Sequence, residues 1–218
     1  MRTIIIIAVS VMCIVRIGHA ESLFELAASG SVPDLTNALA TAYGDEYDVV
    51  AVVNDVRDSS GWSLMHRAAE NNNVPVLTYF LTAGVMPDLG AGPVMATPLH
   101  VGIRGGATNA VIALLDHEAS LSIADNNART PLEWAYLRRN LGILELLLQR
   151  GADPNEPFWR TPRMILQLDG NVTPLSEQII ALFDTHGFDE EYHRSLMLPS
   201  PEHVDEAILD QLFEDTAD

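Results

Sequence analysis

The sequence predicts an all-α solenoid of about five helix-turn-helix units, followed by a C-terminal helical extension. The first observation behind this prediction is a Ser or Thr that recurs at Ser63, Thr97 and Thr130, at intervals of 34 and 33 residues. The second is a leucine-rich segment whose closing position lies 21 residues after each of these three residues. Such self-similarity is typical of repeat architectures, in which each unit buries its apolar face against its neighbours.

The first half of each unit has the signals of a helix start. Thr97 and Thr130 are followed directly by Pro98 and Pro131. A hydroxyl at the N-cap accepts an N–H that has no partner within the helix, and proline fits the first helical position because it has no N–H to satisfy. We therefore expect helices to begin at these two prolines, and a weaker start after Ser63, which lacks the proline.

The second half of each unit has the pattern of an amphipathic helix and of its end. Apolar residues in segment 141–148 fall three or four positions apart, which places them on one helical face. Gly84 and Gly151 then suit the left-handed backbone just past a helix. Each unit is therefore expected to contain a helix, a tight turn, a second antiparallel helix and an extended connector.

The repeated segments resemble a known family. They read TPLHVG, TPLEWA and LLQRGAD, beginning at residues 97, 130 and 147. These segments resemble the ankyrin repeat, whose pattern is roughly G-x-T-P-L-H-x-A-A followed by V-x-x-L-L-x-x-G-A-D. The resemblance is specific in three units and departs from the pattern where Leu64 replaces Pro, Glu133 replaces His and Glu118 replaces Gly.

The resemblance, which covers about residues 22–188, predicts the organisation of the chain. Three clear units are expected at about 58–90, 91–124 and 125–157, between degenerate capping units at 21–57 and 158–188, with an acidic helical tail at 189–218. An insertion in each capping unit lengthens it. The first insertion contains the valine-rich segment Asp48–Val53, which predicts a connector with some strand character.

Residues 1–20 have the features of a secretory signal peptide. A basic start is followed by an apolar run over 4–15, and the small residues Gly18 and Ala20 occupy the positions that a signal peptidase reads. The run is shorter than the ~20 apolar residues that span a membrane. We expect cleavage after Ala20 and export to the periplasm or the exterior. An uncleaved anchor is the alternative, because Arg16 lies close to the cleavage site.

The charge of the chain excludes some classes of partner. The sequence has 12 basic residues, all of them arginine, against 30 acidic residues, which gives a formal net charge of -18. Binding to nucleic acid or to an anionic membrane surface needs clustered cations, so neither is expected. The single cysteine, Cys13, lies within the predicted signal peptide and cannot form a disulfide within the chain.

No catalytic, cofactor or metal motif is present in the sequence. It has no nucleophile elbow, no phosphate-binding glycine loop and no zinc-protease helix. In the ankyrin pattern, His66 and His100 occupy a position whose role is to tie adjacent units by hydrogen bonds. Asp116, His117 and Glu118 are consecutive, so their side chains point in different directions on a helix. We expect no enzymatic activity, no cofactor and no metal.

The resemblance implies a protein-binding surface on the concave side of the stack, at positions four, seven and eight after the capping Ser or Thr. Trp134 and Leu137 would be exposed apolar groups flanked by arginine, a composition that dominates interface energetics. The alternative is that the insertion at 169–173 covers them. The predicted binding residues are Arg67, Glu70, Asn71, Val101, Arg104, Trp134, Leu137 and Arg138 on the concave side, with Trp62, Met95 and Arg129 at the connector tips.

Together these features predict an exported binding module, monomeric on its own, that restrains or protects a protein partner. The acidity of the chain favours a partner with a basic surface, as for an immunity-type inhibitor of a basic exported toxin, because opposite charge speeds encounter. Two alternatives stay open. One is a periplasmic stress-protection or assembly scaffold, and the other is a secreted effector that binds a host protein.

Overall fold

The computed structural model describes residues 22–155 and 174–189 of the 218-residue chain. It divides into two compact units, Met1–Ala152 and Asp153–Asp218, each of which is considered by itself. The predicted signal peptide, the insertion at 169–173 and residues 190–218 of the predicted tail lie outside the described residues. Those predictions therefore stay predictions.

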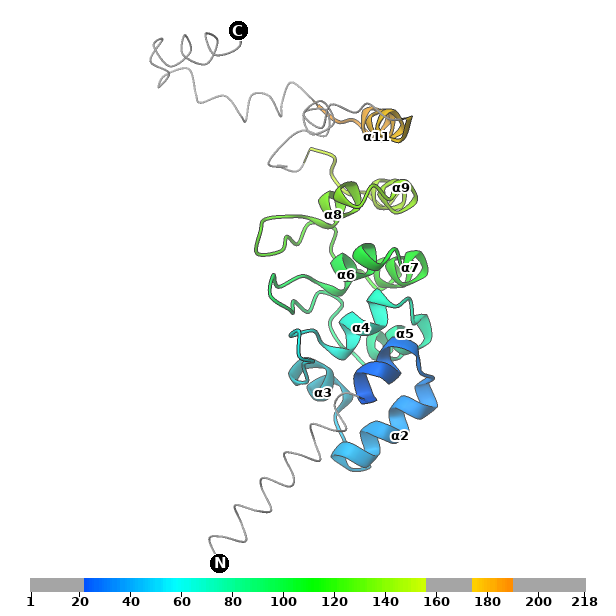
Figure 1. Ribbon diagram of the computed structural model, residues 1–218, viewed down its shortest axis with the longest axis vertical. Coiled ribbons are helices and arrows are strands. Elements are labelled where there is room, and N and C mark those ends of the chain that lie inside the picture. Colours follow the sequence, from blue (N-terminus) through cyan, green and yellow to red (C-terminus); the bar gives the residue numbers. More distant parts are fainter. Residues whose placement is uncertain (1–21, 156–173, 190–218) are drawn as a thin grey trace, which may run out of the picture. The chain divides into compact units, whose positions relative to one another are not determined.

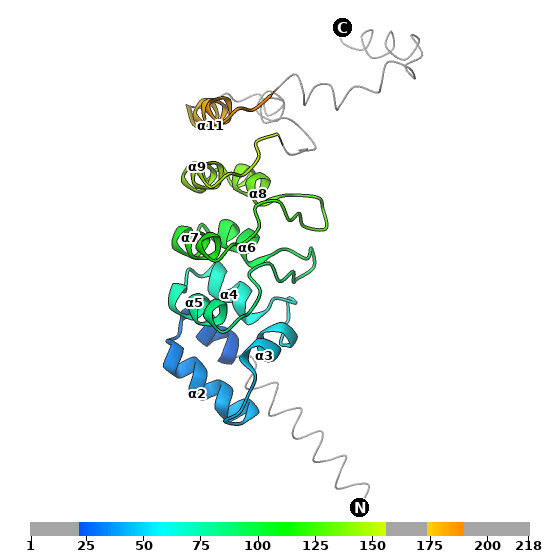
Figure 2. The same ribbon diagram turned by 180° about the vertical axis from the view of Figure 1, so that it is seen from behind.

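Paired helices build the first unit. Residues 22–29 are helical and precede α2 (Val32–Tyr43) and α3 (Val49–Asp55). Three pairs follow: α4 (Leu64–Glu70) with α5 (Val74–Thr82), α6 (Pro98–Gly105) with α7 (Thr108–Asp116), and α8 (Pro131–Leu137) with α9 (Leu141–Gln149). In Figures 1 and 2, α4, α6 and α8 form one layer and α5, α7 and α9 a second, with connectors projecting beyond the first layer. The predicted all-α solenoid is confirmed.

The helix boundaries agree with the signals that predicted them. Ser63, Thr97 and Thr130 are the N-caps of α4, α6 and α8, each with extended backbone. Gly84 and Gly151, which follow the second helices, both have φ of 94°. A residue with a side chain is strained at that angle, so glycine is favoured at both helix ends.

The sequence prediction was wrong for the segment Asp48–Val53. Asp48 is the N-cap of α3 and the residues after it are helical, with no strand character. The Asp48 carboxylate accepts hydrogen bonds from the backbone N–H groups of Val50 and Ala51, at 2.9 and 3.2 Å. Val52 and Val53 are buried. A β-branched side chain lowers helix propensity only slightly, so the cap and the buried valines together outweigh the strand preference.

The core of the first unit lies between the two layers of helices. Leu99, Leu132, Leu77 and Val111 are completely buried there. A Cβ atom on Gly105 would lie 2.2 Å from the carbonyl oxygen of Glu70. The missing side chain at this position therefore lets the end of α6 approach the end of α4 closely.

Two histidines tie adjacent repeats together. His66 Nε2 lies 2.9 Å from the carbonyl oxygen of Ala96, and His100 Nε2 lies 3.1 Å from that of Arg129. A carbonyl only accepts, so Nε2 donates in both rings, and Nδ1 accepts from the hydroxyls of Ser63 and Thr97 at 2.7 and 2.9 Å. Burial lowers the pKa of both histidines to about 4, which keeps them neutral. We call this pair the histidine ladder.

The second unit contains α11 (Pro174–Thr185) within its described part. The side chain of Asn155 donates to the carbonyl oxygen of Gly187 at 3.0 Å and accepts from the N–H of Asp189 at 2.7 Å. Phe183 is buried and makes an edge contact with Phe188 at 5.7 Å. Across the described residues of both units, no helix is long and apolar enough to cross a membrane.

Candidate functional site

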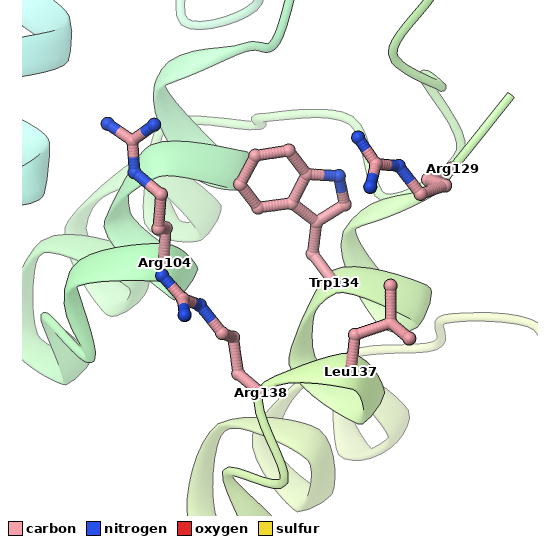
Figure 3. A pocket seen from close by; sticks show the side chains of 5 residues that line it. All are labelled: Arg104, Arg129, Trp134, Leu137 and Arg138. Atoms are coloured by element: carbon pink, nitrogen blue, oxygen red, sulfur yellow. The ribbon is translucent and has the colours of Figure 1, made fainter. Parts of the chain in front are cut away.

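Five side chains line a hollow of about 310 Å³ on the first unit: Arg104, Arg129, Trp134, Leu137 and Arg138 (Figure 3). All five belong to the set of binding residues predicted from the sequence. We call this feature the arginine–tryptophan hollow. Its volume lies at the lower end of the range of small-molecule sites, about 300–1,000 Å³. It therefore has room for one or two side chains of a partner.

The local fold explains why these side chains meet. Trp134 and Leu137 lie on α8 and Arg138 is its C-cap, so the three occupy one face at spacings of three and four residues. Arg129 comes from the connector that precedes α8. Arg104 comes from the last turn of α6, one repeat earlier. Two neighbouring repeats and one connector therefore build the hollow.

Asp125 positions two of the lining side chains. Its carboxylate Oδ2 accepts from Nε and Nη2 of Arg129 at 3.1 and 2.7 Å, and from the indole Nε1 of Trp134 at 3.2 Å. Oδ1 accepts the backbone N–H groups of Asn127 and Arg129. Burial alone would raise the pKa of Asp125, but these donors hold it below its ordinary value. The carboxylate is thus ionised and fixes both groups.

The indole of Trp134 is further held from two sides. The guanidinium carbon of Arg129 lies 5.3 Å from its ring centroid, and the ring of His100 meets it edge-on at 5.4 Å. Trp134 nevertheless keeps part of its surface exposed, and Leu137 is 48 % exposed. The hollow therefore presents apolar surface whose indole component is already fixed in place.

Arg104 is held by an ion-pair network. Its Nη2 donates to Glu70 at 2.7 Å, Glu70 also accepts from Arg67 at 2.9 Å, and Arg67 pairs with Asp58. The guanidinium of Arg104 also lies 4.8 Å from the ring centroid of Trp62. The predicted residues Arg67 and Glu70 are therefore outside the hollow and support it through Arg104.

The prediction of binding residues was wrong for Val101 and Trp62. Val101 is completely buried and Trp62 is only 6 % exposed, so neither presents its side chain to a partner. Trp62 packs against the next repeat, where a Cβ atom on Gly92 would lie 2.6 Å from its ring. Asn71 and Met95 are exposed but do not line the hollow.

Glu133 occupies, in the third clear repeat, the position that His66 and His100 occupy in the first two, and it differs chemically from them. Burial raises the pKa of Glu133 to about 7, while Arg129 acts against that shift and Asp125 adds to it. Its backbone N–H donates to the hydroxyl of Thr130 at 3.4 Å, so the helix cap is kept. At this repeat position the protein therefore has two neutral rings and one carboxyl group whose pKa, about 7, lies near neutral pH.

Sequence reasoning missed the two positioning aspartates, Asp58 and Asp125. Each lies five residues before a capping residue, Ser63 or Thr130, so a signal was available in the repeat register. Each accepts the backbone N–H groups two and four residues further along. An acidic residue at this register position therefore marks a connector that its own side chain holds in shape.

The described residues hold no group of three or more His, Cys, Asp or Glu side chains placed to bind a metal ion. Arg104 and Arg129 are engaged in ion pairs, and the lining of the hollow contains no nucleophile paired with a base. The predictions of no cofactor and no enzymatic activity stay predictions.

Comparison with known proteins agrees with the helix pairs. Residues 88–157 match the family model for ankyrin repeats, in three copies. This segment of the chain contains ankyrin repeats. The crystal structure of an ankyrin repeat domain from Acinetobacter baumannii has the same fold, with a TM-score of 0.62 and 20 % sequence identity. The match covers 77 % of this chain and 82 % of that one.

The chain matches only a small part of each of two curated relatives. A putative palmitoyltransferase ZDHHC13 from Danio rerio is 34 % identical over 115 residues, 51 % of this chain and 18 % of the relative. The human transient receptor potential cation channel subfamily A member 1 is 25 % identical over 142 residues, 64 % of this chain and 13 % of the relative. The chain thus spans less than a fifth of these proteins, and the palmitoyltransferase matches run through the ankyrin region.

Ankyrin repeats indicate a protein–protein interaction module and imply a protein partner. The ankyrin fold is generally a non-catalytic binding scaffold. The geometry of the arginine–tryptophan hollow suits that role, because it combines fixed aromatic surface with guanidinium groups, the side chains that are enriched where interfaces gain most of their energy.

Proposed function

We propose that this chain is an exported ankyrin-repeat module that binds a protein partner through the arginine–tryptophan hollow and restrains or protects it. The observation that carries the proposal is the grouping of Trp134, Leu137 and three arginines around one hollow. Trp and Arg are the side chains most often found to dominate binding energy, particularly where their conformation is fixed before the partner arrives.

The overall charge supports a partner whose surface is basic as a whole. With a formal net charge of -18, the chain attracts a cationic protein from a distance and repels an acidic one. This is the behaviour of an immunity-type inhibitor paired with a basic exported toxin. Added salt should then slow association, because long-range attraction between exposed charges is screened beyond about 10 Å at 0.1 M.

A capture experiment with matched variants tests the hollow. The exported chain serves as bait in an envelope extract, alongside a double variant Leu137→Ser with Arg138→Gln, which changes exposed side chains only. We expect the protein that binds the unchanged bait to be lost from the double variant. Retention of that protein at full level would exclude the hollow as the binding surface.

The matched control replaces one exposed apolar residue and one arginine elsewhere. Ile123 is 38 % exposed, and Arg150 pairs on the surface with Asp116 at 3.0 Å. Ile123→Ser with Arg150→Gln changes charge and apolar surface by the same kind of step as the test variant. This control bait should capture the partner normally.

Export is tested by the N-terminus of the chain recovered from cells. Mass spectrometry of the protein from the periplasm or the medium should give a chain that begins at Glu21. A chain that keeps residues 1–20 and stays in the cytoplasm would contradict the export part of the proposal.

A further inference from the structure

The lining of the arginine–tryptophan hollow is cationic. Three of its five side chains are arginines, Arg104, Arg129 and Arg138, and no carboxylate lines it. This local charge is opposite in sign to that of the chain as a whole, which is -18. The lining, and not the net charge of the chain, decides whether an anionic or a cationic group binds here, because salt screens distant charges more than adjacent ones.

The carboxylates that balance the arginines lie behind them. The side chain of Asp125 is completely buried, whereas that of Arg129 is 30 % exposed. Arg129 uses Nε and Nη2 on Asp125, and its Nη1 donates to no described residue. Arg138 is exposed and pairs with no carboxylate among the described residues. Guanidinium donors therefore remain available on the side that faces the hollow (Figure 3).

A second property of the hollow is its apolar floor. Trp134 lies between Arg104 and Arg129 in Figure 3, and Leu137 lies beside it with 48 % of its surface exposed. A simple anion would leave this apolar surface in water. A group that carries a carboxylate next to an aliphatic or aromatic side chain covers the apolar floor and pairs the guanidinium groups at once.

We propose that the hollow binds an acidic segment of a protein partner, in which Glu or Asp alternates with aliphatic or aromatic residues. A carboxylate of that segment pairs with Arg138 and with the free guanidinium donors of Arg129, and its apolar neighbour packs on Trp134 and Leu137. The proposal rests on the proposed function and adds to it the chemistry of the partner at the same hollow. A partner that is basic overall meets both conditions by presenting one such segment.

Fluorescence anisotropy of labelled peptides on the full chain tests this chemistry. The first probe is a short peptide of alternating Glu and Leu, and the comparison peptides carry Gln or Lys in place of Glu. We expect the Glu peptide to bind about fivefold more tightly than the Gln peptide, as for one exposed charge-assisted pair worth about 1 kcal/mol. Equal binding of the two, or tighter binding of the Lys peptide, would overturn the proposal.

Matched variants locate the effect. Arg138→Gln should weaken binding of the Glu peptide about fivefold, to the level of the Gln peptide. Arg150→Gln removes the same charge from a surface pair outside the hollow and should leave binding unchanged. Weakening by both variants to the same extent would mean a general charge effect and would overturn the assignment to the hollow.

Failure of this inference is distinguishable from failure of the proposed function. If the captured partner is lost from a Leu137→Ser bait and kept by an Arg138→Gln bait, the hollow is a binding surface but not one for carboxylates. If neither substitution affects capture, the hollow is not the surface at all. A polyglutamate peptide that binds as tightly as the Glu–Leu peptide would overturn the apolar part alone.

Discussion

The connectors that begin the first and third clear repeats each have an aspartate at the same position, with the same hydrogen-bonding role. They differ in that tryptophan and arginine have exchanged positions. Four residues after Asp58 comes Trp62 and nine residues after it Arg67, whereas Asp125 is followed at the same distances by Arg129 and Trp134. Both aspartates accept backbone N–H groups two and four residues on. The scaffold of the two connectors is therefore shared.

The exchange changes what the tryptophan does. Trp62, four residues after its aspartate, is buried against Gly92 and covered by Arg104 from the next repeat. Trp134, nine residues after Asp125, lies on α8 and keeps part of its surface exposed in the hollow. One position thus makes tryptophan a packing residue between repeats, and the other makes it part of a candidate interface.

The largest expected effect in this comparison comes from removing the aspartates. Asp125→Ala leaves five N–H groups without their buried acceptor and should lower the free energy of unfolding by about 3 to 4 kcal/mol. Asp58 is 11 % exposed, so Asp58→Ala should cost about 2 kcal/mol. Urea denaturation measures both, and equal losses would mean that burial does not distinguish the two connectors.

The next effect tests the packing of Trp62. Gly92 has φ of 73° and lies against the indole, so Gly92→Ala combines backbone strain with overpacking and should cost about 2 to 3 kcal/mol. Gly84→Ala is the control, because Gly84 has a similar φ of 94° and open space around it. It should cost about 1 kcal/mol. If both variants lose the same stability, the contact with Trp62 contributes nothing.

The histidine ladder and Glu133 should respond to pH in opposite directions. In the unfolded chain a histidine binds a proton as pH falls below its ordinary pKa of 6.5, whereas folded His66 and His100 have a pKa of about 4. Between pH 6.5 and pH 4 the unfolded state therefore binds more protons, and the free energy of unfolding falls as pH falls. Glu133 has a pKa of 4.5 in the unfolded chain and about 7 in the folded protein. The free energy of unfolding therefore falls as pH rises from 4.5 to 7.

A single substitution separates the two responses. Glu133→Gln removes the titrating group and should raise the free energy of unfolding by about 2 kcal/mol at pH 8, with little change at pH 5. Denaturation midpoints of both proteins at the two pH values measure this difference. Glu145→Gln on α9, an exposed carboxylate, is the control. A gain at pH 5 as large as at pH 8 would show that the effect does not arise from titration.

The smallest expected effect concerns the arginines that cover the two indoles. Arg104→Gln removes a cation over a tryptophan ring and an ion pair between partly exposed groups, at a cost of about 1 kcal/mol. Arg129→Gln should cost more, about 2 kcal/mol, because it also takes the cation away from the buried carboxylate of Asp125. Arg129→Gln should also weaken partner binding more than Arg104→Gln does, because Arg129 lies over Trp134, the exposed indole. If neither variant loses binding, the cation–π contacts do not contribute to the interface.

The fold was predictable because its signals are local. Thr97 and Thr130 with their prolines mark helix starts, and Gly84 and Gly151 mark helix ends, without reference to distant residues. The valine-rich segment 48–53 was predicted wrongly, since the cap formed by Asp48 outweighed the strand preference of valine.

The candidate site was predictable only in part. Position in the repeat placed Trp134, Leu137 and Arg138 on one face, but it gave Val101 the same status, and Val101 is buried. Register alone does not report what the neighbouring repeat brings against a side chain. The burial of Trp62 depends on Gly92 and Arg104, which follow it by 30 and 42 residues.

Arg129 belongs to two structures at once, since its carbonyl oxygen accepts the bond from His100 and its guanidinium lines the hollow. A ligand that immobilises this residue therefore acts as a clamp on the junction between two repeats. By mass action, a partner at one hundred times its dissociation constant adds about 2.7 kcal/mol to the stability of the state it selects. Amide hydrogens of α6 and α8 should then exchange more slowly in the complex, which makes exchange rates a reporter of occupancy at the hollow.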